Sequence, residues 1–322
     1  MSGTGMRIIF MGTPEFAVTS LQRLLDDGQQ VVAVITAPDK PSGRGRKIQP
    51  TPVKVFAAEK GLPVLQPANL KDPAFIERLR SLKADLQLVV AFRMLPEIVW
   101  KMPGRGTVNL HASLLPDYRG AAPINWAIIN GEVKTGVTTF FIEQNIDTGN
   151  ILFREEVPIL PEETAGDLHD KLMEKGADLL VKTVHAIDKN NYELIKQSDL
   201  VKEREIKQAP KIFKENCRID WSLDIYRIHN FIRGLSPYPA AFTEFSCKNK
   251  ITPVKIYDAE KKTEKHDKPA GTIVTDNKSY FDIAVDGGFI KIKTLQLAGK
   301  NKLSISDFLK GFDTREQCYL VF

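Results

Sequence analysis

The chain has 322 residues, of which 43% are hydrophobic and 26% charged, with 19 prolines and 21 glycines. This composition is that of a globular protein and excludes fibrous and disordered chains, and the length suffices for two domains with cores of their own. Most of the net charge of +5 falls in residues 191–322, which is compatible with an anionic partner or with a solvated basic surface.

A strand–helix–strand pattern opens the chain. The apolar run 7–11 predicts a strand, Pro14 begins a helical pattern that Gly28 ends, and the run 31–35 predicts a second strand. We expect further helices at 52–60, 72–82, 122–130 and 164–187, and further strands at 63–65, 86–91, 107–111, 136–142 and 151–157. Strands that alternate with helices predict a doubly wound, mostly parallel, Rossmann-like α/β domain over residues 1–190.

The sequence changes character after residue 190. Residues 191–210 are polar and charged, which is typical of a linker, and 224–233 then predict a helix. Short apolar runs separated by turn residues follow at 241–245, 254–257, 271–274, 281–285 and 289–297. Because Asp286-Gly287-Gly288 is a hairpin signal between two of these runs, we expect residues 211–322 to form a small β-barrel.

Two polar residues lie at the end of a predicted strand. Asn109 and His111 are two positions apart, so their side chains point to one face at the carboxyl end of a strand, where open α/β sheets bind ligands. An amide can donate a hydrogen bond to a developing oxyanion, and an imidazole with a pKa of about 6.5 can transfer a proton near neutrality. An ordinary polar strand end has the same pattern, so the spacing alone leaves both readings open.

A carboxylate and a basic loop are the other candidates. Asp147 lies between two apolar strands, where it could orient a nearby histidine, although Asp-Thr-Gly also suits a plain turn. The loop 38–47 is longer than the usual connection of about 2–6 residues. Its cations, Lys40, Arg44, Arg46 and Lys47, could bind phosphates or be solvated.

Four motifs, in this order along the chain, resemble those of the folate-dependent formyltransferases. They are VNLHASLLP at 108–116, YRGAAP at 118–123, GVT at 136–138 and DTG at 147–149. A long ordered signature is more specific than any of its parts. The resemblance implies that Asn109, His111 and Asp147 are the catalytic residues and that 10-formyltetrahydrofolate is the co-substrate. The five histidines are scattered along the sequence, so we expect no metal site.

The resemblance also implies where the folate binds. The implied contacts are Phe92, Arg93, Met94, Leu95, Ser113, Leu114, Leu115, Pro116 and Ile146. The sequence departs from the family at one point, because the family often has an aromatic residue and then glycine where this chain has Phe92 and then Arg93. Arg93 would therefore alter the shape of the folate pocket or reach the glutamate tail of the folate.

Within the family, the chain is most similar to the branch that formylates methionine on initiator tRNA. Residues 38–47 and the following QPTPVK resemble the loop that this branch inserts at the acceptor end, which implies tRNA contacts from Lys40, Arg44, Arg46 and Lys47. Further matching motifs lie at 218–222, 232–239 and 297–300. The resemblance implies that this region forms a barrel of OB-like form that holds the tRNA.

The resemblance implies a mechanism as well. The α-amine of methionine attacks the formyl carbon, Asn109 and a protonated His111 stabilise the oxyanion, and Asp147 supports the imidazolium. Two other functions stay open: formyl transfer to a nucleotide or sugar-nucleotide amine, and RNA binding without catalysis.

The remaining sequence features predict the compartment. The three cysteines, Cys217, Cys247 and Cys318, are far apart and form no CxxC pair, so we expect neither a disulfide framework nor a zinc site. The N-terminus does not resemble a signal peptide, and no apolar run approaches the ~18 residues that span a bilayer. We therefore expect a cytoplasmic protein that binds no membrane. A monomer is a separate expectation, because the sequence does not give the oligomeric state.

Overall fold

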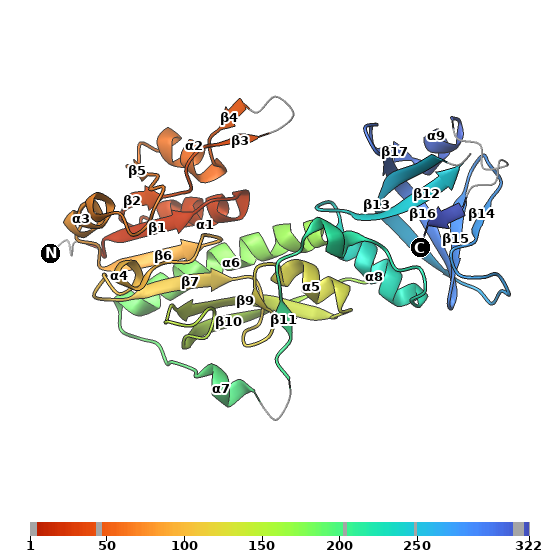
Figure 1. The fold of residues 1–322 in the computed structure, drawn as a ribbon. Coiled ribbons are helices and arrows are strands. Elements are labelled where there is room, and N and C mark those ends of the chain that lie inside the picture. Colours follow the sequence, from red (N-terminus) through yellow and green to blue (C-terminus); the bar gives the residue numbers. More distant parts are fainter. Residues whose placement is uncertain (1–4, 43–46, 202–204, 248–249, 312–318, 322) are drawn as a thin grey trace. The chain divides into compact units, whose positions relative to one another are not determined.

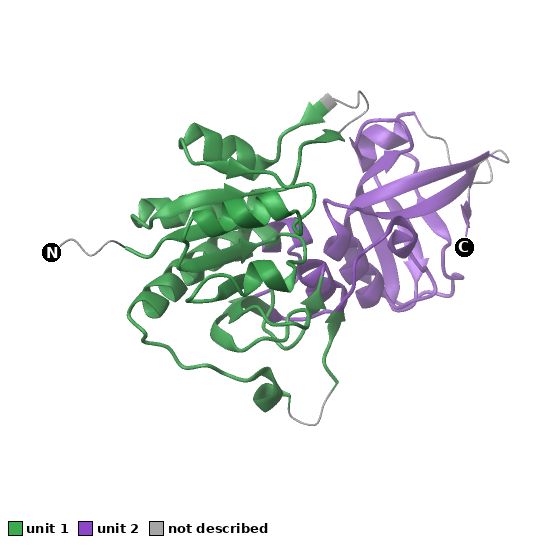
Figure 2. Ribbon diagram, turned by 60° about the vertical axis from the view of Figure 1, so that its left-hand side comes forward, with its two compact units in different colours: residues 1–120, 135–157, 169–208 green, residues 121–134, 158–168, 209–322 purple. Residues whose placement is uncertain are grey.

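The computed structural model divides the chain into two compact units, each assembled from separate segments (Figures 1 and 2). It describes residues 5–42, 47–201, 205–247, 250–311 and 319–321. The first unit comprises residues 1–120, 135–157 and 169–208, and the second comprises 121–134, 158–168 and 209–322. The second unit thus includes two short segments of the N-terminal half. The functional division into 1–190, 191–210 and 211–322 stays a prediction.

The first unit is built on a seven-stranded sheet of order β10-β9-β7-β6-β1-β2-β5. Its strands are β1 (Ile8–Gly12), β2 (Val31–Ile35), β5 (Val64–Leu65), β6 (Leu86–Val90), β7 (Thr107–His111), β9 (Lys134–Phe141) and β10 (Ile151–Pro158). The pairs from β5 to β7 are parallel, and β9 is antiparallel to β7. The mostly parallel sheet expected from the sequence is confirmed.

Helices cover both faces of this sheet (Figure 1). The helices within residues 15–188 are α1 (Glu15–Asp26), α2 (Pro52–Glu59), α3 (Pro73–Ser81), α4 (Glu97–Trp100), α5 (Pro123–Ile129) and α6 (Ala165–Asp188), of which α5 and the start of α6 belong to the second unit. On one face Met11 of β1 packs in a cluster with Leu79 of α3 and Val99 of α4. On the other face Leu110 of β7 packs against Gly176 of α6, where a Cβ would lie 2.9 Å from Leu110 Cδ2. This layering is the doubly wound arrangement.

Short elements occur where loops were expected. In the basic loop, β3 (Lys40–Ser42) and β4 (Lys47–Gln49) pair as an antiparallel hairpin, so the prediction of a loop without secondary structure was wrong at both of its ends. After β7 the chain forms the short strand β8 (Arg119–Gly120). The segment 191–210 contains α7 (Gln197–Leu200) and β11 (Gln208–Ala209).

The second unit holds a curled antiparallel sheet of order β14-β15-β16-β13-β12-β18, with β17 paired to β16. Its strands are β12 (Ala241–Cys247), β13 (Lys250–Thr263), β14 (Ile273–Thr275), β15 (Phe281–Val285), β16 (Gly288–Leu297), β17 (Leu303–Ser304) and β18 (Tyr319–Val321). Its helical elements are η1 (Lys214–Cys217), α8 (Ile225–Leu235) and α9 (Ile305–Leu309). Trp221, Phe245 and Phe281 lie in the core. The small barrel-like domain expected from the sequence is confirmed.

The predicted hairpin of this sheet shows why glycine is required there. Val285 pairs with Gly288, which leaves Asp286 and Gly287 as the turn. Gly287 has a φ of 87° and Gly288 a φ of 148°, values that L side chains rarely adopt. A Cβ on Gly288 would also lie 2.1 Å from the carbonyl oxygen of Lys262. Both the turn and the close strand pairing therefore depend on glycine.

Candidate active site

The candidate site begins at the carboxyl end of β7, where the sheet changes from parallel to antiparallel pairing. Asn109 lies between Val89 of β6 and Phe140 of β9 in the sheet register. Asn109 is half-buried, and His111, two residues further, is only 7% exposed. Because alternate residues of a strand point to one face, both polar side chains lie on the same side of β7.

The two ring nitrogens of His111 face different groups. Its Nε2 atom lies 2.8 Å from the carbonyl oxygen of Tyr118, and because a carbonyl can only accept, Nε2 carries the hydrogen of this bond. Its Nδ1 atom lies 3.9 Å from Oδ2 of Asp147, which is beyond hydrogen-bonding distance. With Nε2 occupied, Nδ1 is the ring atom that can exchange a proton with a ligand.

Asp147 lies on a tightly defined turn between β9 and β10. Its φ is 53°, in the left-handed region, and its Oδ2 accepts a hydrogen bond from the backbone nitrogen of Gly120 at 3.1 Å. Two residues later, a Cβ on Gly149 would lie 1.7 Å from the carbonyl oxygen of Phe141, so only glycine fits. The Asp-Thr-Gly sequence therefore forms a turn, and this turn carries the carboxylate to His111.

Sequence reasoning gave no site role to two further residues. The guanidinium of Arg119 lies near the carboxylates of Asp147 and Asp117, and burial lowers the pKa of Arg119 while the two negative charges act in the opposite direction. Gln197, in the expected linker, hydrogen-bonds to Arg119 and to the turn of Asp147. Arg119 stands in the recognised motif at 118–123, whereas no sequence signal marks Gln197.

The loop after His111 is held by hydrogen bonds to Thr138 of β9 and between its own residues. The hydroxyl of Thr138 donates to the carbonyl of Ser113 at 2.6 Å and accepts from the nitrogen of Leu115 at 3.2 Å. The hydroxyl of Ser113 donates to the carbonyl of Asp117 at 2.6 Å. Ser113, Leu115 and Pro116 are buried, so their side chains fix the loop. Leu114, the fourth folate contact expected in this loop, is half-buried.

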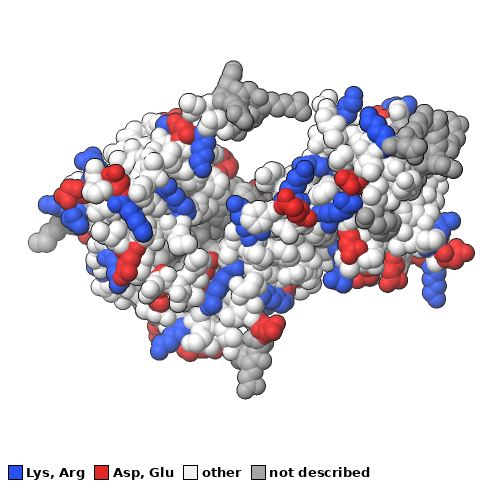
Figure 3. All heavy atoms as spheres, viewed as in Figure 1, with Lys and Arg blue, Asp and Glu red and all other residues white. Residues whose placement is uncertain are grey.

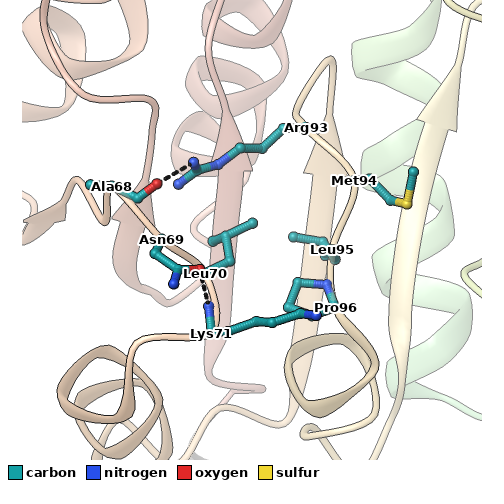
Figure 4. Close-up of a pocket in the computed structure, with 8 residues that line it drawn as sticks. All are labelled: Ala68, Asn69, Leu70, Lys71, Arg93, Met94, Leu95 and Pro96. Atoms are coloured by element: carbon teal, nitrogen blue, oxygen red, sulfur yellow. Dashed lines mark hydrogen bonds between the residues drawn. The ribbon is translucent and has the colours of Figure 1, made fainter.

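A pocket of about 440 Å³ lies between residues 68–71 and 93–96 (Figure 4). The guanidinium of Arg93 donates to the carbonyls of Ala68, at 2.9 Å, and of Pro67, and its Nε is buried without a hydrogen-bond partner among the described atoms. Burial lowers the pKa of Arg93. Arg93 thus shapes one wall of this pocket, and a contact with the glutamate tail stays a prediction.

Two expected folate residues expose apolar surface. Met94 is 73% exposed beside the pocket, and Ile146, next to Asp147, is 59% exposed. Phe92 is half-buried and its ring centroid lies 5.6 Å from the guanidinium carbon of Arg93. Leu95 is buried and lines the pocket.

The basic hairpin is anchored at its base. Asp39 forms an ion pair of 2.5 Å with Lys54, and Gln66 donates to its other oxygen at 2.7 Å. The hydrogen bond from Gln66, followed by that from Lys54, lowers the pKa of Asp39. Lys40 is exposed. Arg44 and Arg46 lie outside the described residues, as does the side chain of Lys47.

Two findings concern metals and membranes. Among the residues that the structure describes, no group of three His, Cys, Asp or Glu side chains is arranged to hold a metal ion. Within the same ranges, no helix combines the length and the apolar character that a membrane-crossing segment requires.

Comparison with known proteins identifies the family. The model of the formyl transferase family matches residues 6–184, and the model of the formyl transferase C-terminal domain matches residues 211–313. This chain belongs to the formyl transferase family. The motif resemblance is thereby confirmed, and the chain is a transferase.

Relatives that are more than half identical to this chain are named for the same activity. The chain is 56% identical over 319 residues to the methionyl-tRNA formyltransferase of Phocaeicola vulgatus, with 98% of each chain covered. It is 54% identical over 315 residues to the methionyl-tRNA formyltransferase of Parabacteroides distasonis, with 97% of each chain covered.

Solved structures of more distant family members share the fold. A sugar 3N-formyl transferase, WlaRD, determined with dTDP and 5-N-formyl-THF, has a TM-score of 0.63 at 22% identity and covers 93% of this chain and 100% of its own. HypX from Aquifex aeolicus, in complex with tetrahydrofolic acid, has a TM-score of 0.63 at 18% identity and covers 99% of this chain and 51% of its own.

Proposed function

We propose that this protein transfers the formyl group of 10-formyltetrahydrofolate to the α-amino group of methionine on initiator methionyl-tRNA. The observation that carries the proposal is the identity of 50–56% with methionyl-tRNA formyltransferases over nearly the whole length of both chains. The relatives are bacterial, and translation initiation is a cytoplasmic process, so we expect the protein to act in the cytoplasm, as a monomer that binds no membrane.

Catalysis is assigned to Asn109, His111 and Asp147. The methionine amine attacks the formyl carbon, and the resulting oxyanion accepts hydrogen bonds from the Asn109 amide and a protonated His111. The amine then loses a proton, the C–N bond to the folate breaks, and the departing folate nitrogen gains a proton. The geometry supports this assignment because Nδ1 of His111 faces Asp147 while Tyr118 occupies Nε2.

The co-substrate is a reduced folate that binds against residues 92–95, 113–116 and 146. Met94 and Ile146 expose large apolar side chains, and a planar pterin or aminobenzoyl ring would remove that surface from water. Arg93, whose guanidinium donates to the carbonyl of Ala68, gives the pocket wall a positive charge. This charge is suited to the carboxylates of the glutamate tail.

The tRNA is proposed to contact the hairpin β3–β4 through Lys40, Arg44, Arg46 and Lys47, and the second unit through a basic strip. Basic and acidic side chains are interspersed on the face in Figure 3, so net charge alone does not locate an RNA surface. We define the basic strip as Tyr238, Lys255, Tyr257, Lys300 and Lys302.

Two contacts place lysines of the basic strip close to its tyrosines. The amine of Lys255 donates to the carbonyl of Pro239 at 2.9 Å, directly after Tyr238, which is 81% exposed. The amine of Lys302 lies 4.4 Å from the ring centroid of Tyr257. Tyr238 is exposed and Tyr257 is half-buried. Aromatic rings beside lysines suit RNA, because rings can stack on bases while amines contact phosphates.

The decisive experiment is the transfer of labelled formyl from 10-formyltetrahydrofolate to charged initiator tRNA. We expect transfer to initiator methionyl-tRNA and little transfer to elongator methionyl-tRNA. Transfer to a nucleotide amine or a sugar-nucleotide amine instead would replace the proposed acceptor. Binding of tRNA without turnover of any folate would favour the RNA-binding alternative.

A further inference from the structure

Gln197 connects the segment 191–210 to the candidate active site. It lies at the start of α7 and is only 3% exposed. Its Nε2 donates to the carbonyls of Asp147 and Gly149, both at 2.9 Å, and its Oε1 accepts from Nη2 and Nε of Arg119 at 2.6 and 3.1 Å. One carboxamide therefore satisfies four hydrogen bonds between a polar segment, the Asp147 turn and Arg119.

The chain around Gln197 is fixed to the same region. Ile195 and Ile151 exchange backbone hydrogen bonds of 3.0 and 2.9 Å, which aligns the segment beside the start of β10. Three residues after Gln197, Leu200 packs against a buried cluster that includes Leu115 of the loop after His111. Residues 195–200 are thus part of the packed structure around the site, and their position does not depend on Gln197 alone.

The chemistry of the position selects glutamine. The two carbonyl partners require a donor, and the guanidinium of Arg119 requires an acceptor, so a side chain with both functions at the right length is needed. A glutamate would accept from Arg119 but could not donate to the carbonyls of Asp147 and Gly149. An alanine would leave all of these buried polar groups without their partner, at a cost in stability of the turn.

The turn that Gln197 holds is the one that presents the carboxylate. Asp147 adopts a left-handed backbone with a φ of 53°, a conformation that costs free energy for a residue other than glycine and persists only where the surroundings enforce it. Gln197 binds the carbonyls on both sides of Thr148, so it fixes two peptide planes of this turn. Loss of the carboxamide would let the turn relax and move the carboxylate away from His111.

We propose that Gln197 is a positioning residue of the active site, which holds the Asp147 turn and Arg119 together so that the Asp147 carboxylate faces His111. The inference deepens the proposed function and rests on it for its kinetic consequences. It also predicts a property of the protein without substrate, because the backbone N–H of Gly120 donates to Oδ2 of Asp147 and reports the position of that carboxylate.

The experiment compares Gln197→Ala and Gln197→Glu with Asp199→Asn, an exposed residue two positions further on α7. In the formylation assay, we expect both Gln197 variants to lower kcat by about 100-fold, the loss that a misplacement of about 1 Å in a reacting group can cause. The KM for folate and for tRNA should change by less than about threefold, and Asp199→Asn should match the wild type. Because both Gln197 variants lose the two donated hydrogen bonds, a loss of kcat in both supports the inference.

The second measurement needs no activity. Amide hydrogen exchange at Gly120 should accelerate in both Gln197 variants and stay at the wild-type rate in Asp199→Asn. Wild-type kcat in both Gln197 variants, a loss confined to the KM for tRNA, or unchanged exchange at Gly120 would each overturn the inference. If the wild type itself formylates no methionyl-tRNA, the proposed function fails, and the exchange result still decides whether Gln197 positions Asp147.

Discussion

The Nδ1 atom of His111 lies 3.9 Å from Oδ2 of Asp147, and the two residues come from elements 36 positions apart in the sequence. The pair is nearly buried, and each member has a second backbone contact, Tyr118 for the ring and Gly120 for the carboxylate. A ligand that approaches the two side chains would therefore meet groups whose orientation is already set.

We predict that His111→Ala and Asp147→Ala each lower kcat by about 10²–10⁴-fold, because each variant removes a group that stabilises the oxyanion or supports proton transfer. Single-turnover formylation with purified protein measures the loss, and circular dichroism verifies that both variants fold. The matched control is His169→Ala, since half-buried His169 and exposed Asp170 form another His–Asp contact, at 2.9 Å, on α6. Near-normal rates in both active-site variants would remove the catalytic assignment.

We predict that Lys255→Ala combined with Lys302→Ala raises the KM for initiator methionyl-tRNA and leaves the KM for the folate unchanged. The plot of log affinity against log salt has a negative slope. Its magnitude should become smaller by about 0.7–0.9 for every phosphate that the variant no longer neutralises. Filter binding over a range of salt concentrations measures this slope. Lys189→Ala, an exposed lysine after α6, serves as the control for net charge. A slope that is the same in the double variant and in the control would exclude the basic strip as the RNA surface.

We predict that Arg44→Ala impairs the use of tRNA and leaves folate binding intact, because Arg44 lies in the basic sequence between β3 and β4, which the resemblance assigns to tRNA contacts. Separate titrations of folate and of tRNA distinguish the two effects. Equal losses in both titrations would show that this arginine acts on the fold or the folate pocket.

A pH effect on stability is expected from His229, which is 2% exposed in the second unit. Its Nε2 donates to the carbonyl of Ala259 at 3.1 Å and lies 3.0 Å from Oε2 of Glu162, while Nδ1 accepts from the amine of Lys261 at 2.9 Å. Burial, followed by the charge of Lys261, lowers the pKa of His229 to about 4, and the charge of Glu162 acts in the opposite direction. The folded protein therefore keeps this ring neutral at pH values where the unfolded chain protonates it.

The sign of the pH effect follows from this lowered pKa. Below the ordinary pKa of 6.5 the unfolded chain binds a proton at His229 that the folded chain does not, so the stabilisation is present above pH 6.5 and is lost as the pH falls toward 4. Between pH 7 and 5 we expect a loss of roughly 1–2 kcal/mol in the free energy of unfolding. Denaturant titrations of wild type and His229→Gln should show a weaker dependence on pH in the variant. An equal pH dependence of the free energy of unfolding in the wild type and in His229→Gln would contradict the prediction. The control is His185→Gln, at an exposed histidine.

Strong local patterns allowed the sequence to predict the sheet strands. The strands 31–35 and 107–111 were predicted with their observed bounds. The first is an apolar run, and the second alternates polar and apolar residues. The hairpin β3–β4 was missed, since a basic, glycine-containing loop has no alternation that would indicate strands. Its pairing depends on tertiary anchors such as Lys54 on α2.

The candidate site was predictable only in part from local patterns. The shared face of Asn109 and His111 follows from the alternation of a strand, but the approach of Asp147 depends on a sheet that brings distant segments together, and only the family resemblance pointed to it. Gln197 has no local signal at all, because its role arises from partners that lie 48 to 78 positions earlier in the chain.

The second unit draws on three segments, and this affects how the protein can be divided. Asn125 of α5 donates to the carbonyl of Gly234 of α8 at 2.8 Å, and a Cβ on Gly234 would lie 2.7 Å from Cγ1 of Ile129. Arg233 of the same helix donates to the carbonyl of Glu163 at 2.8 Å. A C-terminal fragment that begins at residue 211 would lack α5 and residues 158–168 and would expose these surfaces of α8, so a truncation designed on the family boundary would cut through the second unit.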